Sequence, residues 1–144
     1  MPPRDIDVLD SESEILEIIR LIGPPRCRLL LVDSVMEWSK SVGIPEDDPF
    51  RAARAVVQQP GDVPTIVMLK NISEAIQGSI TGLLLFRGFG DEADRLQNSA
   101  VFLEHLVLHE IAHLVLENPS ESDCDEWAFE RLAEHPRISS GDAA

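Results

Sequence analysis

The segment 109–113, with the sequence HEIAH, lies inside the apolar run 106–116, which is predicted to form a helix. Residues four apart on a helix lie one turn apart on the same face, so His109 and His113 can close on a single metal ion. Glu110 then lies near that ion but is poorly placed to bind it. Two neutral imidazoles suit Zn²⁺, and a neighbouring carboxylate suits proton removal from a metal-activated water. The simpler alternative is a helix that packs two histidines on a partly buried face without metal.

Two histidines are not a complete site, because catalytic zinc takes three protein ligands and a water. Glu117 lies about 12 Å along the helix from His109, which is too far to share the ion. Leu116 and Pro119 occupy the positions where a longer HExxHxxGxxH site has Gly and His. The third ligand is therefore expected beyond Pro119, where Ser120 and Asp123 resemble a capping box that opens another helix.

The segment 121–128, ESDCDEWA, is similar to the E-x-x-A-(D/N)-x-(F/W)-A helix that follows HExxH in gluzincins of the ImmA/IrrE-type regulatory metallopeptidases. The size of the chain resembles that of the minigluzincins. The likeness covers residues 106–132, and Cys124 stands where the family usually has Ala. The resemblance implies a zincin-like peptidase domain in which Glu121 is the third zinc ligand and Asp125 orients a ligand histidine.

Helix geometry favours a different third ligand. Glu121 follows His113 after a shorter connection than these families usually have. In an antiparallel helix pair with a turn at residues 118–120, the residue level with His113 is closer to Asp125. Asp125 therefore remains an alternative to Glu121. Cys124 is a conceivable ligand, although a small packing residue is the simpler interpretation.

The chain has 26 acidic and 12 basic residues, a formal net charge of −14, and no cluster of Lys or Arg. Binding to nucleic acid and to anionic membrane surfaces is therefore disfavoured, since both depend on basic side chains that neutralise phosphates. The N-terminus shows no signal-peptide pattern, and no apolar stretch approaches the span of a bilayer. We expect a cytoplasmic protein in which Cys27 and Cys124 are reduced thiols.

The predicted fold is a single α+β domain over residues 1–144, with a small mixed sheet backed by helices. Residues 1–10 and 137–144 are expected to fray. Helices are predicted from residue 11 or 13 to 22, from 48 to about 60, from 91 or 98 into the 109–113 motif, and after 120. Strands are predicted at 28–32, 63–69 and 80–86, and the segment 35–42 is ambiguous, with a turn of helix as one interpretation.

The leading hypothesis is a zinc-dependent peptidase in which His109, His113 and either Glu121 or Asp125 bind Zn²⁺. Glu110 would act as the general base on the attacking water. By the family resemblance, a peptide or protein substrate would lie extended along an edge strand, for which 80–86 is the predicted segment. The chain has no Tyr, so oxyanion stabilisation would fall to His135, Arg131 or backbone N–H groups.

Two alternatives remain. The first is a zinc-binding regulatory or protein-interaction module that cleaves nothing. The second is a metal-free scaffold in which the HExxH motif is accidental.

Overall fold

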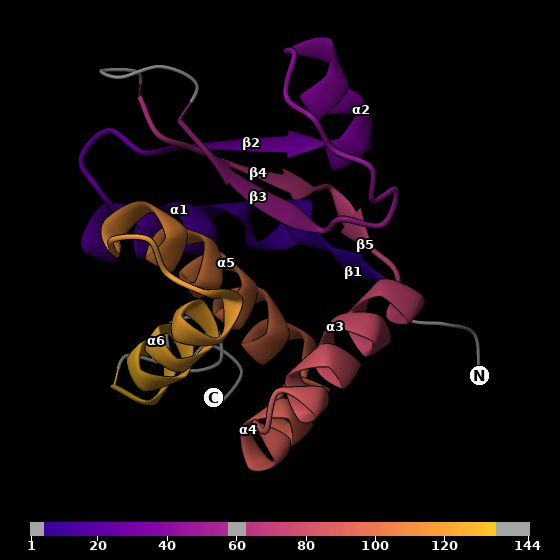
Figure 1. Cartoon of the computed structure of the whole chain (residues 1–144), viewed down its shortest axis with the longest axis vertical. Helices are drawn as coiled ribbons and strands as arrows, with labels where there is room; N and C mark the ends of the chain where they lie inside the picture. The colour runs from indigo at the N-terminus through magenta and orange to yellow at the C-terminus, as the bar shows by residue number, and fades with distance from the viewer. Residues whose placement is uncertain (1–4, 58–62, 135–144) are drawn as a thin grey trace.

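The computed structural model describes residues 5–57 and 63–134. These residues form an α+β fold in which helices accompany a small mixed sheet and a two-stranded ribbon (Figure 1). The helices are α1 (Glu12–Ile22), α2 (Val35–Ser41), α3 (Glu74–Phe86), α4 (Gly90–Arg95), α5 (Ser99–Val115) and α6 (Glu121–Glu134), with a short 3-10 helix η1 (Val8–Ser11) before α1. The strands are β1 (Ile6–Asp7), β2 (Arg28–Val32), β3 (Ala53–Val56), β4 (Thr65–Leu69) and β5 (Asn71–Ile72). The predicted α+β class and mixed sheet are confirmed.

The larger sheet has the strand order β2-β4-β3. β2 runs parallel to β4, with Leu30 opposite Val67, and β3 runs antiparallel to β4, with Ala55 opposite Ile66. Every residue of β4 is buried, which explains why this strand is a continuous apolar run rather than an alternating one. In this strand order, β3 forms one edge of the sheet among the strands that the structure describes.

Helix α5 carries the HExxH motif through the middle of the helical layer. It packs against β3 and β4, and it also contacts α1 and α6 (Figure 1). Residues 101–112 of this helix are all buried. A helix buried on every side is expected to be apolar all round. The polar side chains that α5 nevertheless buries are Glu104, His105, His109 and Glu110.

The predicted helix at 48–60 is wrong, because Ala53–Val56 forms β3. Its alanines favour helix locally, but antiparallel pairing with β4 outweighs that preference. The Asp48 side chain, which was interpreted as the start of a helix, instead accepts a hydrogen bond from the Phe50 backbone N–H at 2.9 Å. Such a bond two residues along the chain stabilises a turn. Pro60 and Gly61, the predicted end of that helix, lie outside the described residues.

The predicted strand at 80–86 is also wrong, since these residues form the second half of α3. The start of α3 is capped by Ser73, whose hydroxyl accepts a hydrogen bond from the Ile76 N–H at 3.1 Å. Ile76, Ile80 and Leu84 recur every four residues and face the core, a helical period that the glycines at 78 and 82 obscure. The segment is therefore not the edge strand that was expected to bind an extended substrate.

Residues 5–10 do not fray as predicted. Ile6 pairs with Ile72 in the β1–β5 ribbon, and Val8 is fully buried. Residues 137–144, which were also expected to fray, lie outside the described part of the chain. The ambiguous segment 35–42 contains α2, which Ser34 caps by accepting a hydrogen bond from the Glu37 N–H. None of the helices described here is long and apolar enough to span a bilayer.

Candidate metal centre

The two motif histidines lie one turn apart on α5, with ring centroids separated by 5.1 Å. His109 is buried, whereas the side chain of His113 is 28% exposed. Glu110, between them in sequence, is also buried. The local part of the sequence prediction, a buried helix that carries both imidazoles on one side, agrees with this placement.

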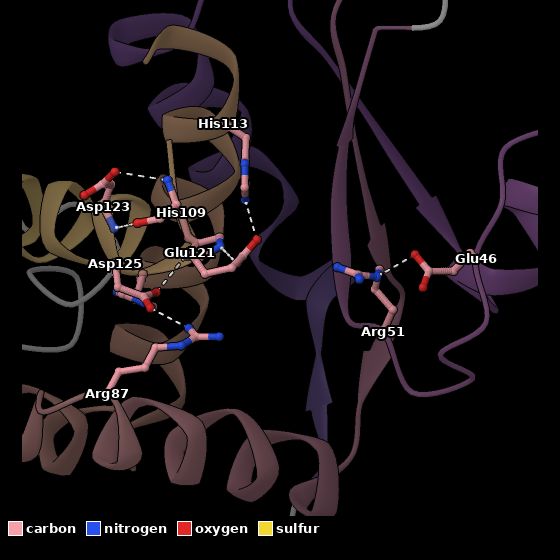
Figure 2. Close-up of polar contacts among 10 residues, drawn as sticks. Glu46, Arg51, Arg87, His109, His113, Glu121, Asp123 and Asp125 are labelled. Atoms are coloured by element: carbon pink, nitrogen blue, oxygen red, sulfur yellow. Dashed lines mark hydrogen bonds and ion pairs between the residues drawn. The ribbon is translucent and has the colours of Figure 1, made fainter. Parts of the chain in front are cut away.

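A tight chain reversal between α5 and α6 brings the third group to these histidines. Asn118 adopts a left-handed backbone conformation with φ of 48°, which Asn tolerates better than most residues. Ser120 and Asp123 then form the predicted capping box. The Ser120 N–H donates to Asp123 Oδ2 and the Asp123 N–H donates to Ser120 Oγ, both at 3.0 Å. The first turn of α6, which begins at Glu121, is thereby fixed beside the C-terminal half of α5 (Figure 2).

The Glu121 carboxylate lies between the two motif imidazoles. Its Oε2 is 2.8 Å from His109 Nε2, and its Oε1 is 3.2 Å from His113 Nε2 (Figure 2). Two imidazole nitrogens and one carboxylate oxygen form a donor set that suits Zn²⁺. These three residues can therefore hold a metal ion after a small outward movement of the carboxylate.

Asp125 lies on the other side of His109. Its Oδ1 is 2.7 Å from His109 Nδ1 and 3.2 Å from His105 Nε2, while its Oδ2 accepts a 2.7 Å hydrogen bond from Arg87 (Figure 2). A carboxylate at Nδ1 fixes the tautomer and the orientation of an imidazole whose Nε2 binds metal. This is the position that the family resemblance assigned to Asp125.

The helix register explains where these two carboxylates lie. Because α6 begins directly after the reversal, Glu121 is level with His109 and His113, and Asp125 is one turn further back, level with His105 and His109. The expectation that a short connection would bring Asp125 level with His113 is therefore not what the structure shows. His105 is buried against Phe129, with ring centroids 4.2 Å apart.

The carboxylates dominate the electrostatics of the site. Burial alone would lower the pKa of His109, but hydrogen bonds to Asp125 and Glu121 outweigh it and raise this pKa to about 10. Hydrogen bonds from His109 and His113 hold the pKa of Glu121 well below its usual range. Burial raises the pKa of Glu110, with the nearby histidines opposing the shift. Glu110 is consequently a stronger base than an exposed carboxylate, which suits a proton acceptor.

Two groups of side chains in the described part of the chain are close enough to hold an ion. His109, His113 and Cys124 form one group, and His105, His109 and Asp125 form the other. In each group, one ligand atom per residue lies within 4.8 Å of the others. Either group could thus hold a metal ion, and Glu121 contacts both histidines of the first group.

A cleft of about 410 Å³ opens beside these residues. His109, Glu110 and Glu121 line it from the α5–α6 side. Side chains of α3, most of them apolar, form one of the opposite walls. The segment 48–53, which leads into β3, forms another. The candidate base Glu110 and two of the candidate ligands, His109 and Glu121, therefore line one solvent-connected hollow, as suits an active site.

Two arginines of the cleft were missed by the sequence analysis. Arg87, at the end of α3, binds Asp125, and Arg51 contacts Glu46 through its Nε at 2.6 Å. No local pattern marks either residue, since only the tertiary fold carries them to the site. The predicted oxyanion residue Arg131 instead lies over the Trp127 ring, 4.8 Å from its centre. His135, the other predicted residue, lies outside the described residues.

The third ligand can be identified by comparing two variants. Glu121→Ala should lose zinc nearly as completely as a variant of a ligand histidine, because it removes a group that contacts both Nε2 atoms. Asp125→Asn should weaken zinc affinity only about 10- to 100-fold, as loss of a residue that orients a ligand does. Zinc titration against a competing chelator, on variants shown to be folded by circular dichroism, measures both.

Glu117→Ala is the matched control, since it removes an exposed carboxylate close to the site in sequence, and its affinity should equal that of the wild type. If Glu121→Ala and Asp125→Asn exchange phenotypes, Asp125 is the ligand. Near-wild-type affinity in both would refute both assignments and direct attention to Asp123, Cys124 and Glu126.

Comparison with known proteins gives no relative: no family model, no curated protein and no solved structure matches the chain.

Proposed function

We propose that this chain is a zinc-dependent peptidase of the gluzincin type. The observation that carries the proposal is the Glu121 carboxylate, which lies between the Nε2 atoms of His109 and His113 in the wall of a cleft that Glu110 also lines. This combination supplies three potential metal ligands and a buried base, and His109, Glu121 and Glu110 line the same hollow. The family resemblance of residues 106–132 points to the same activity.

In the proposed mechanism, His109, His113 and Glu121 hold the zinc ion. Bound zinc supplies Lewis acidity, which polarises the scissile carbonyl and makes a water nucleophilic near neutral pH. Glu110 takes the proton from the attacking water and later delivers it to the nitrogen of the leaving amine. Asp125 holds the His109 ring through Nδ1, so that Nε2 faces the metal position.

The walls of the cleft support a peptide as substrate. β3 has an outer edge without a strand partner among the described strands, and Ala52 and Ala53 at its start line the cleft. An extended peptide beside this edge would gain main-chain hydrogen bonds. The apolar α3 side chains on the other wall would then receive apolar substrate side chains. Arg51, which is paired with Glu46, is the cleft cation that would turn to an oxyanion.

A non-catalytic zinc-binding module is the second candidate. The placement of Cys124 favours it, because the sulfur lies with the nitrogens of His109 and His113 in one potential ligand group. Structural zinc sites are closed by four protein ligands, whereas catalytic sites keep a position open for water.

Zinc-loaded protein should cleave an unstructured, fluorescence-quenched protein substrate, and a chelator should stop the cleavage until zinc is restored. Metal analysis of the same sample establishes that zinc is bound. A folded, zinc-replete protein that cleaves none of a diverse set of unstructured peptides would contradict the peptidase and favour the second candidate. A folded protein that takes up no zinc would contradict both and leave the metal-free scaffold.

A further inference from the structure

On the premise of the metal site proposed above, we infer that Cys124 is a fourth protein ligand and that the resting metal site is closed. The sulfur of Cys124 and one ring nitrogen each of His109 and His113 all lie within 4.8 Å of one another. The Cys124 side chain is fully buried, so this sulfur faces the protein interior at the site rather than solvent.

The geometry of α6 places the sulfur and the carboxylate together. Cys124 follows Glu121 by three residues, so both lie on the same face of the helix. Contacts from Glu121 to His109 and His113 show that this face is turned toward α5. The capping box of Ser120 and Asp123 anchors the same turn. Donor groups of Glu121 and Cys124 on α6 therefore face the His109 and His113 rings on α5.

The second potential ligand group is less suited to a metal cation than the first. In that group, Asp125 already accepts a 2.7 Å hydrogen bond from the Arg87 guanidinium. A metal cation bound to the same carboxylate would face the positive charge of Arg87 at short range. In the group that contains Cys124, the Glu121 carboxylate adds negative charge beside His109 and His113, which favours a cation there. The metal is therefore assigned to the group that contains Cys124.

Two imidazole nitrogens, one carboxylate oxygen and one thiolate sulfur complete the tetrahedral coordination that zinc prefers. As the sulfur–metal bond forms, the sulfur–hydrogen bond of the thiol breaks and its proton passes to solvent. A site filled in this way has no position for water. The resting site is then closed to water, and hydrolysis by zinc-loaded protein proceeds when Cys124 leaves the metal.

Cobalt spectroscopy tests this ligand set without reference to activity. Metal-free full-length protein is titrated with Co²⁺ alone, because a thiolate bound to Co²⁺ gives a near-ultraviolet charge-transfer band that nitrogen and oxygen ligands do not give. The wild type should show this band, with visible absorption typical of tetrahedral Co²⁺. Cys124→Ala should lose the band and bind Co²⁺ more than about 10-fold more weakly, since even loss of a residue that only orients a ligand costs this much.

Cys27→Ala is the matched control, because Cys27 is the other cysteine of the chain, and it should keep the band. Even if Cys124→Ala does not fold, the wild-type spectrum shows whether a thiolate is bound to Co²⁺. Stoichiometric Co²⁺ without a charge-transfer band would overturn the closed site and leave the metal site of the proposed peptidase intact. Loss of the band in Cys27→Ala would also overturn the closed site. Failure of folded wild type to bind Co²⁺ would overturn the inference and the metal site together.

Discussion

Substitution of His113 by alanine is expected to reduce bound zinc from about one ion per chain to none under zinc-replete conditions. In the proposed site His113 supplies one of the two nitrogen ligands, and its Nε2 lies 3.2 Å from the Glu121 carboxylate. Because its side chain is 28% exposed, the substitution disturbs the core little. His109→Ala should lose zinc equally, but it also removes the partner of two carboxylates, Asp125 and Glu121. Elemental analysis after dialysis measures the zinc content.

The control for this prediction is His105→Gln. His105 belongs only to the second potential ligand group, so this variant should retain zinc close to the wild-type amount. Thermal unfolding in the presence of a chelator shows whether each metal-free variant is folded. If His113→Ala keeps zinc and His105→Gln loses it, the metal lies on the Asp125 side of His109, and the proposed ligand set is wrong.

The second large effect is expected in Glu110→Gln, in which hydrolysis should fall by about 10²- to 10⁴-fold while zinc content stays unchanged. Glutamine keeps the shape of glutamate but cannot accept the proton of the attacking water. Glu110 lines the cleft beside His109 and Glu121 without belonging to either potential ligand group. Loss of this carboxylate should therefore reduce hydrolysis without reducing metal binding. Initial rates per zinc-loaded molecule are the measurement.

Glu104→Gln is the matched control, since Glu104 is another fully buried glutamate of α5 and is not among the residues that line the cleft. Its hydrolysis rate per folded molecule should remain close to that of the wild type. Hydrolysis that survives in Glu110→Gln would refute the general-base assignment. Loss of zinc in Glu110→Gln would instead show that the carboxylate supports the metal site itself.

Features that depend on neighbours along the chain could be predicted from the sequence alone. The i, i+4 spacing of His109 and His113 fixes their relation once residues 106–116 form a helix. The capping box at Ser120 and Asp123 is equally local, and so is the apolar run that became β4. In each case the interacting groups are a few residues apart, so local geometry and the local burial pattern are sufficient to predict the structure.

Features that depend on distant partners were decided by the tertiary structure. Residues 53–56 became a strand because β4 offered them backbone hydrogen bonds, which outweighed the helix preference of alanine. The placement of Glu121 and Asp125 on opposite sides of His109 follows from the register between α5 and α6, and a one-turn shift could bring Asp125 to the place that Glu121 occupies. Arg51 and Arg87 reach the cleft only through the packing of α3 and the segment 48–53 around α5 and α6. Sequence spacing determines which residues share a helix face, but packing between elements determines what that face meets.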